Sequence, residues 1–455
     1  MAAAPYLIVS PLSFMSLVGL IGGRPEPPPA NPGIVKELSV DAFVPAHNEG
    51  KNIAFALASL ARQTKKPGKV FVINDASDDD TKDVIAAFSK MNELDIILVE
   101  RRERQGKVPA LEQIARFSDA DVLFVLDGDT MLESPDYIEK AMVELFRATS
   151  NASASGFITS MMHSDRIKAS EWLQITELLD RKPDTRLFND DSPIGRILRS
   201  LTNTYRDLLY YVDQYIVSMG EFSLFGTLVN PPTCAVAYRR DMLVDLFKKA
   251  KPGQDNAHSV PEDFFVEFGF IERGLHNVQV LDIRANSHER EADNLLKQFY
   301  IWSRAWLQSS YFFPQLVSMP FKAMKRRRKK SGKNILQESV YVPYEEPLGR
   351  LRGAQSKGRI GWTVLIALFE KISFPLILML LLVERGWQVM LLIIFWESIL
   401  YALITGIYGK ANKMKYVVRG ILLTPLRYLS IFMDVFSVGK FLVELATPAK
   451  AKKPS

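Results

Sequence analysis

The sequence has few of the residues that form covalent or metal cross-links. Its 455 residues include one cysteine, Cys234, so an intramolecular disulfide framework is excluded and a reducing compartment fits the composition. The five histidines, at positions 47, 163, 258, 276 and 288, are scattered, and no two of them have the spacing of zinc ligands. A chain of this length has room for two or three domains and a sizeable hydrophobic core.

The sequence also lacks a strong excess of one charge. Lysine and arginine total 57 and the acidic residues 51, which gives a net charge of +6. The basic run 325–330, Lys-Arg-Arg-Arg-Lys-Lys, stands near long apolar segments. This arrangement favours anionic lipid headgroups over nucleic acid as the partner, so no nucleic-acid binding is expected.

Between Leu38 and about residue 130 the sequence alternates between short apolar runs and amphipathic segments. A short apolar run that leads into polar residues indicates a strand buried on both faces, and the segments between the runs have the periodicity of helices. Strand, polar loop and helix repeat at roughly thirty-residue spacing, which predicts a doubly wound, mostly parallel α/β sheet. The four predicted strands are 39–44, 70–73, 96–99 and 122–126.

The last of these runs leads directly into Asp127-Gly128-Asp129. Open α/β sheets bind ligands at the carboxyl ends of their strands. We expect Gly128 to let the backbone turn tightly so that the two carboxylates converge. Oxygen ligands at this spacing suit Mg²⁺ or Mn²⁺ that carries a diphosphate. The alternative is a pair of solvated aspartates in a turn.

Two more polar residues are expected at the same edge of the sheet. Asp75 follows the second strand and could accept hydrogen bonds from a uracil or a ribose; the alternative is a helix N-cap or a turn residue. Lys107 follows Gln105-Gly106 and could offset the charge of a diphosphate; the alternative is a solvated surface lysine. Their shared position at the edge is what favours a nucleotide site.

Several stretches together resemble the family 2 glycosyltransferases with a GT-A fold, in particular the membrane-bound branch that contains hyaluronan, chitin and cellulose synthases. The resemblance covers about residues 38–306. The matching stretches are VPAHNE (44–49), INDASDDDT (73–81), GKVPAL (106–111), LDGDT (126–130), ED (262–263) and a version of the Q-x-x-R-W motif at 298–302.

The resemblance implies an inverting glycosyl transfer that needs Mg²⁺ or Mn²⁺ and a general base. It assigns the base to Asp263, although Glu262 and Asp263 could also be an acidic pair at a helix N-terminus. Trp302 would stack under the acceptor sugar, or else belong with Trp306 to an interfacial aromatic belt. The implied metal ligand is Asp129; the donor-binding residues are Pro45, His47, Glu49, Asp75, Lys107, Asp127 and Arg304; the acceptor-binding residues are Glu262, Gln298 and Trp302.

The sequence departs from the family pattern at several points. Ile301 stands where the family has an arginine that contacts the diphosphate. Arg304, three residues on, is the candidate replacement, because the two share a helix face. Pro261 replaces a threonine, and the segment 230–234, Asn-Pro-Pro-Thr-Cys, lacks the usual glycine-proline pair. The change at Ile301 weakens the case for processive polymerisation more than the case for glycosyl transfer.

Long apolar runs predict a membrane-associated C-terminal half. Residues 362–383 and 388–408 are long enough to span a bilayer. The run 416–446 contains charged residues, among them Arg419, Arg427, Asp434 and Lys440, and could be a spanning helix, a re-entrant pair or a surface helix. The expected organisation is an N-terminal membrane or interfacial segment and proline-rich tether (1–34), a cytosolic GT-A domain (35–315), a basic juxtamembrane linker (316–360), transmembrane or interfacial helices (361–446) and a basic tail (447–455).

The function expected from these features is a multi-pass, membrane-anchored glycosyltransferase with a cytosolic catalytic domain. It would move a sugar from a nucleotide sugar, expected to be UDP-linked, onto a growing polysaccharide. The alternatives are transfer of a single sugar to a lipid or glycan, or a catalytically inactive nucleotide-sugar-binding membrane protein. The expected partners are the donor, a glycan or lipid acceptor and anionic membrane lipids, and homo-oligomer formation stays open.

Overall fold

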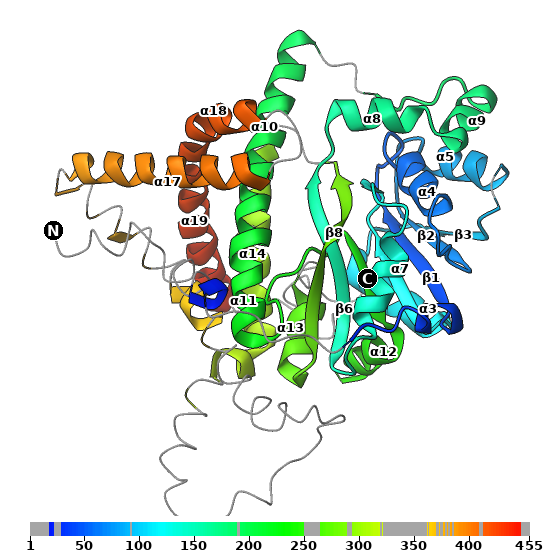
Figure 1. The fold of residues 1–455 in the computed structure, drawn as a ribbon, viewed down its shortest axis with the longest axis horizontal. Helices are drawn as coiled ribbons and strands as arrows, with labels where there is room; N and C mark the ends of the chain where they lie inside the picture. The colour runs from blue at the N-terminus through cyan, green and yellow to red at the C-terminus, as the bar shows by residue number, and fades with distance from the viewer. Residues whose placement is uncertain are drawn as a thin grey trace, which may run out of the picture.

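A computed structural model gives the fold of most of the chain (Figure 1). Of the N-terminal membrane or interfacial segment and tether predicted at 1–34, the structure describes only 18–21 and 29–34. The basic run 325–330 and the tail 447–455 also lie outside them. The described residues are 18–21, 29–91, 93–188, 192–249, 264–288, 294–318, 321, 362, 364–369, 373, 376–377, 380, 383–384, 386–408 and 413–446.

One eight-stranded sheet forms the centre of the N-terminal part, with the strand order β3-β2-β1-β4-β7-β6-β8-β5. The first four strands in this order are parallel to one another, and β6 is parallel to β8. Strands β7 and β5 run antiparallel to their neighbours. The strands are β1 Val40–Ala46, β2 Val70–Asp75, β3 Ile96–Arg101, β4 Val122–Leu126, β5 Thr130–Leu132, β6 Asn151–Ser160, β7 Ala235–Arg239 and β8 His276–Ser287.

Successive residues of the parallel strands enter two different hydrophobic cores. In β4, Phe124 and Leu126 belong to one core, and Leu123 and Val125 belong to the other. This alternation explains the uninterrupted apolar runs, because side chains on both faces of the sheet are covered. The predicted α/β class with a doubly wound sheet is therefore confirmed. One core is covered by α4 Ile53–Ala61, α5 Thr81–Ser89 and α7 Tyr137–Leu145, and the other by α6 Lys107–Phe117, α12 Arg240–Lys249 and α13 Phe265–Arg273.

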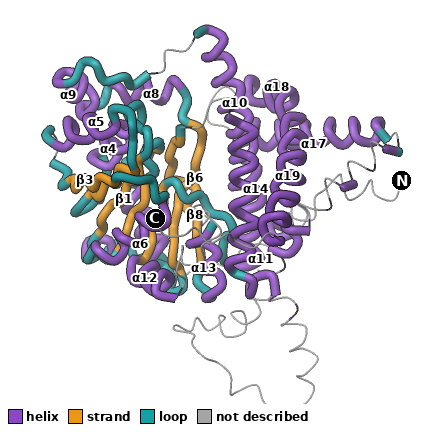
Figure 2. Tube along the Cα trace, turned by 180° about the vertical axis from the view of Figure 1, so that it is seen from behind, coloured by secondary structure: helices purple, strands orange, loops and turns teal. Residues whose placement is uncertain are grey.

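A long helical rod separates the sheet from the C-terminal helices (Figures 1 and 2). It consists of α10 Pro193–Val212, the π-helical segment η1 Asp213–Val217 and α11 Ser218–Phe225. Ser192 caps its start, since Ser192 Oγ accepts a hydrogen bond from the Gly195 backbone N at 3.1 Å. Helix α14, Leu295–Phe312, lies beside the rod. Two short helices, α8 His163–Ser170 and α9 Leu173–Arg181, precede the rod in the chain, and α3 Ile34–Glu37 precedes the first strand of the sheet.

The C-terminal helices contain one candidate membrane span among the described residues. This helix is α17, Trp387–Tyr408, with a mean hydropathy of 2.0. The apolar run 416–446 is two helices, α18 Lys413–Leu423 and α19 Arg427–Ala446, joined by the short 3₁₀ segment η3 Thr424–Leu426. The described residues do not support several crossings, because α18 is short and α19 contains Asp434 and Lys440 within its length.

Polar contacts attach the C-terminal helices to the rod. Tyr416 of α18 donates a hydrogen bond to Asp207 Oδ2 at 3.0 Å. Arg419 donates to Ser200 Oγ and Thr204 Oγ1, both at 2.9 Å. The apolar run around Leu208 packs against α17, so it belongs to a hydrophobic core between α10 and α17. The C-terminal helices are thus part of the same body as the sheet.

Candidate functional site

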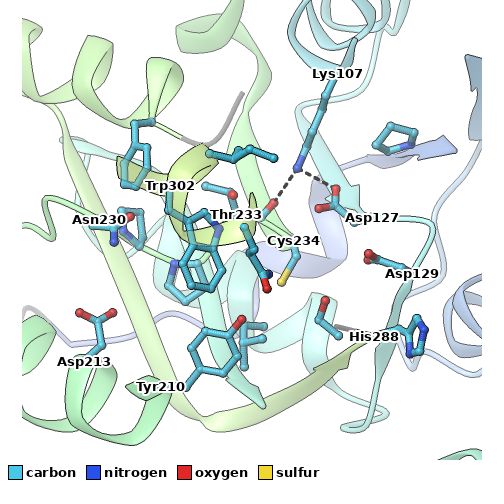
Figure 3. Close-up of a pocket in the computed structure, with 18 of the residues that line it drawn as sticks. Lys107, Asp127, Asp129, Tyr210, Asp213, Asn230, Thr233, Cys234, His288 and Trp302 are labelled. Atoms are coloured by element: carbon cyan, nitrogen blue, oxygen red, sulfur yellow. Dashed lines mark hydrogen bonds and ion pairs between the residues drawn. The ribbon is translucent and has the colours of Figure 1, made fainter. Parts of the chain in front are cut away.

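A cavity of about 870 Å³ opens at the carboxyl ends of the parallel strands. This volume is typical of ligand sites, which range from about 300 to 1,000 Å³. One wall comes from the loops after β1, β2 and β4, and the facing wall comes from the rod and α14. Of the residues that the sequence predicts for the site, Pro45, His47, Glu49, Asp75, Lys107, Asp127, Asp129, Gln298 and Trp302 line this cavity (Figure 3).

The turn after β4 is fixed by backbone hydrogen bonds to two neighbouring strands. The backbone N of Asp127 donates to Cys234 O at 2.8 Å, and that of Gly128 donates to Pro45 O at 3.1 Å. Gly128 does not have a positive φ, so the expected reason for a glycine at this place is wrong. A Cβ atom here would lie 3.0 Å from Pro45 O and 3.3 Å from Glu49 Cγ. The close approach of two loops, rather than a special turn, requires glycine.

Asp129 lies beside a histidine that the sequence did not single out. The backbone N of His288 donates to Asp129 O at 2.8 Å, which continues the antiparallel pairing of Thr130 with Ser287. Directly paired residues of an antiparallel ladder have neighbouring side chains, and Figure 3 shows the two side chains next to each other. Burial, together with nearby cations of which Arg166 contributes most, lowers the pKa of His288 to about 3. The imidazole is therefore neutral and has a lone pair available.

Asp75 holds the loop that carries Lys107. Its carboxylate accepts hydrogen bonds from the backbone N of Gln105 at 3.0 Å and of Gly106 at 2.8 Å, and Arg101 lies at 3.2 Å. Burial raises the pKa of Asp75, but these hydrogen bonds and Arg101 outweigh the burial and hold the pKa below its ordinary value. The structure therefore gives this carboxylate a role in loop positioning, beyond its place in the cavity wall.

Two cations lie near the carboxylates at this end of the cavity. Lys107 Nζ is 2.7 Å from Asp127 Oδ1 and 3.3 Å from Thr233 O. Arg104, from the same loop, also lines the cavity and is exposed. The sequence reasoning did not select Arg104, although the basic loop after β3 was a usable signal. Together the two side chains provide positive charge where a diphosphate would be expected.

Glu49 is an enclosed carboxyl group beside the Asp127 turn. Asn52 Nδ2 donates a hydrogen bond to Glu49 Oε2 at 2.6 Å. Burial raises the pKa of Glu49 to about 7; the charges of Asp127 and Asp79 add to this rise, and the hydrogen bond from Asn52 opposes it. With a pKa of about 7, the Glu49 carboxyl group gains or loses its proton near neutral pH.

Two of the three residues predicted for the acceptor side, Gln298 and Trp302, come from α14. Arg206, which is fully buried in α10, donates from NH2 to Gln298 Oε1 at 2.7 Å. Ile301 and Trp302 line the cavity, but Arg304 does not. Arg304 NH1 instead lies 3.3 Å from Tyr300 Oη. Arg304 therefore lies apart from the other predicted donor residues. Its side chain contacts Tyr300 of the same helix instead of the cavity.

The predicted base and its neighbour lie outside the described residues. Both Glu262 and Asp263 precede Phe264, whose side chain lines the cavity. The helix predicted to end at Gly274 is present as α13, and Gly274 caps it in the left-handed conformation with φ of 81°. Among the described residues, no group of three or more His, Cys, Asp or Glu side chains is arranged to hold a metal ion.

Two acidic residues of the rod also line the cavity, and the sequence reasoning missed them. These are Asp213 in η1 and Glu221 in α11. The sequence contains only a weak signal for them, because each is a single acidic residue in an otherwise apolar helical stretch. Burial raises the pKa of Asp213 to about 7. Burial likewise raises the pKa of Glu221 to about 8, with a further contribution from the charge of Asp213.

Comparison with known proteins gives a family match for the part of the chain that contains most of the sheet. Residues 41–247 match the family model described as glycosyl transferase family 2. The chain is 31% identical over 116 residues to the poly-beta-1,6-N-acetyl-D-glucosamine synthase of Staphylococcus aureus (strain COL). That match covers 25% of this chain and 27% of the synthase, so the chain spans about a quarter of the length of this curated relative.

Two solved structures show a limited likeness to this chain. A mannosyltransferase from Pyrobaculum calidifontis, in complex with GDP-Man and Mn²⁺, has a TM-score of 0.49 at 13% identity, covering 95% of this chain and 99% of that one. The glucosyl-3-phosphoglycerate synthase of Mycobacterium tuberculosis, in complex with Mn²⁺, UDP and phosphoglyceric acid, has a TM-score of 0.38 at 16% identity, covering 64% and 84%.

A Gly128→Ala substitution tests the packing of the turn. The added Cβ would meet the Pro45 backbone oxygen at 3.0 Å, and a backbone atom cannot move aside easily. We expect a loss of about 1–3 kcal/mol in the free energy of unfolding, as for other overpacked sites. Gly68→Ala is the control, because its Cβ would meet nothing closer than 3.4 Å. Equal thermal unfolding midpoints for the two variants would show that the turn tolerates a side chain.

A Glu49→Gln substitution should change the pH dependence of stability. The folded-state pKa of about 7 exceeds the ordinary value of 4.5, so the folded chain prefers the protonated carboxyl and loses stability as the pH rises between these values. From pH 5 to pH 8 the parent should lose ~2–3 kcal/mol more than the variant, at ~1.4 kcal/mol per pKa unit. Urea unfolding in detergent with EDTA measures the difference. Asp213 and Glu221 contribute equally to both proteins, so equal losses would contradict the assignment to Glu49.

Proposed function

We propose that this chain, which carries a glycosyl transferase family 2 domain at residues 41–247, moves a sugar from a nucleotide sugar onto a growing polysaccharide. The observation that carries the proposal is a single cavity with two different ends. One end holds the Lys107–Asp127 pair, with its 2.7 Å contact, and the other holds the indole of Trp302. A charged end suits a diphosphate, and an aromatic face suits a sugar ring.

The donor is proposed to lie along the loops after β1, β2 and β4. His47 Nδ1 is within 2.9 Å of Asp75 O, which places the imidazole beside the nucleotide end of the cavity. Lys107 and Arg104 would neutralise the diphosphate oxygens, with Lys107 exchanging its contact to Asp127 for one to the ligand. We propose a UDP-linked donor, in keeping with the role that the family resemblance gives to Asp75.

The residues near Asp129 fit a divalent metal. Asp129 supplies a carboxylate and His288 a neutral imidazole, two groups that are common metal ligands. Asp129 and His288 would hold the ion, and Asp127 would face the nucleotide side. When bound, Mg²⁺ or Mn²⁺ supplies positive charge that stabilises a departing diphosphate. A site with one nitrogen ligand should favour Mn²⁺ over Mg²⁺, which prefers oxygen.

Proton removal from the acceptor hydroxyl is assigned to Asp263. The residue that follows it in the chain, Phe264, lines the cavity and packs against Trp306 with 5.9 Å between the ring centroids. Glu262 and Gln298 are proposed to contact the acceptor. Direct displacement by the acceptor oxygen would invert the anomeric carbon, and no covalent intermediate with the protein is needed.

A single-sugar transfer to a lipid or glycan is the second candidate function. Ile301 lines the cavity where the family has an arginine, so the described residues of that wall include no lysine or arginine side chain. We propose membrane attachment through α17, since Leu391, Leu392, Phe395 and Trp396 are all more than half exposed on this helix. Apolar side chains in such a continuous set suit contact with lipid.

Substitution of Asp129 tests both the metal and the proposed reaction. We expect Asp129→Asn to lower turnover of a nucleotide sugar by ~10²-fold or more, because a metal contributes several kcal/mol to charge stabilisation. His288→Ala should raise the Mn²⁺ concentration needed for half-maximal activity. Mn²⁺ binding, followed by electron paramagnetic resonance, is an independent readout for both variants. Unchanged Mn²⁺ binding by both would remove this site, and no turnover of any nucleotide sugar by the parent would remove the proposed function.

Two arginine substitutions distinguish the donor-binding cations. Arg104→Gln should weaken binding of UDP with Mn²⁺ by ~5-fold, a value reduced from that of a buried charge-assisted hydrogen bond because Arg104 is exposed. Arg304→Gln is the matched control and should change binding by less than twofold, because Arg304 does not line the cavity. Isothermal titration measures both. A larger effect at Arg304 would restore the assignment made from the sequence.

A further inference from the structure

The two ends of the cavity differ in the ionisable side chains that line them. Lys107 and Arg104 lie at the end formed by the sheet, and Asp213 and Glu221 line the end formed by the rod. In Figure 3, Lys107 and Asp213 stand at opposite sides of the view, with Trp302 between them. Among the described residues that line the cavity, the side chains of lysine and arginine are confined to the first end.

A local change in helix geometry directs Asp213 into the cavity. Asp213 is the first residue of the π-helical segment, and such segments are often found at functional sites. The next residue, Gln214, faces the sheet: its Nε2 donates to Ile158 O at 2.9 Å, and its Oε1 accepts from Ile158 N at 2.9 Å and from Gln279 at 2.7 Å. Because these bonds fix Gln214 on the strand, the preceding side chain lies on another face of the helix, toward the cavity.

The Asp213 carboxylate has no hydrogen-bond or ion-pair partner within the described part of the chain. Its side chain keeps some solvent contact through the cavity while protein surrounds it. Glu221 is more deeply buried, and its Oε2 accepts one hydrogen bond, from the backbone N of Val229 at 3.1 Å. Burial raises the pKa of both carboxyl groups, as expected for acidic groups without a counter-charge. The buried, unpartnered carboxylate points to a ligand with hydrogen-bond donors.

The rod end of the cavity therefore combines aromatic ring faces with carboxyl oxygens that can accept hydrogen bonds. Trp302 and Tyr210 supply aromatic surface, and Asp213 and Glu221 supply oxygens that accept from hydroxyl or ammonium groups. A phosphate or carboxylate brought here would find no lysine or arginine among the described lining residues of this end, and Asp213 and Glu221 would repel it whenever they are ionised. Saccharide hydroxyls and amines would not meet this obstacle.

We propose that the rod end of the cavity, defined by Asp213, Glu221, Tyr210 and Trp302, binds the acceptor saccharide and selects a unit without phosphate or carboxylate. The selected unit is uncharged or carries an amine. Asp213 accepts hydrogen bonds from this unit, Glu221 holds Val229 in place, and neither carboxyl group offers a counter-charge to an anion. The inference rests on the proposed glycosyl transfer and specifies the acceptor class of the same site.

The test compares acceptors of different charge, with a glucuronamide as the uncharged match of each glucuronide because both lack the 6-hydroxyl group. Glucosides, glucosaminides and glucuronides, and the corresponding mannose series, are offered with a nucleotide sugar that the parent enzyme hydrolyses. The parent should use the neutral and amine-bearing acceptors at least ~10-fold better than the acidic ones, by kcat/KM. Asp213→Asn should raise the acceptor KM while the donor KM stays within twofold, and it should reduce the discrimination against acidic acceptors by several-fold.

Two further variants separate this role from structural damage. Glu221→Gln keeps an oxygen for Val229 and should also reduce the discrimination. Asp282→Asn removes an exposed charge that contacts Lys140 at 2.7 Å and should change neither KM nor discrimination. Equal use of acidic and neutral acceptors by the parent would overturn the inference, as would discrimination that is unchanged in Asp213→Asn and Glu221→Gln. Donor hydrolysis is read separately, so its absence would count against the proposed function instead.

Discussion

The backbone hydrogen bonds around Asp127 and Gly128 are the constraint on which the cavity depends. They join the end of β4 to the end of β1 through Pro45 and to the start of β7 through Cys234. Because β1 and β4 are parallel and β7 is antiparallel to them, one turn aligns three strands at a single edge. Every polar side chain at the donor end then takes its position from this edge, and no covalent cross-link is needed.

The parallel half of the sheet could be predicted from the sequence, because its strands are buried on both faces and therefore appear as uninterrupted apolar runs. The cap at Gly274 was predictable for a similar local reason. Strand β6, Asn151–Ser160, was not. Apart from Phe157 and Ile158 its side chains are small or polar, and the polar ones are buried through pairs such as Ser153 with Asn277 at 2.8 Å. Such pairs join residues that are more than a hundred positions apart, so no local pattern reveals them.

The residues of the candidate site likewise divide into those that a local sequence pattern reveals and those that only the fold brings together. Asp127, Lys107 and Trp302 stand in motifs with fixed spacing, and the structure brings them to one cavity. His288 and Asp213 reach the cavity only through strand pairing and a π-helical segment, neither of which leaves a periodic signal. Arg304 was assigned to the donor site from helix periodicity alone. Periodicity shows which residues share a face of a helix, but it does not show what that face packs against.

The rod of α10, η1 and α11 has a consequence for where the reaction takes place. From Pro193 to Phe225 it extends about 50 Å at ~1.5 Å per residue, and its contacts with Tyr416 and Arg419 attach it to α18. Tyr401 of α17 itself lines the cavity, so the rod holds this apolar helix directly against the site. In a bilayer-attached chain, an acceptor would therefore meet the donor beside α17, without a long extension away from that helix.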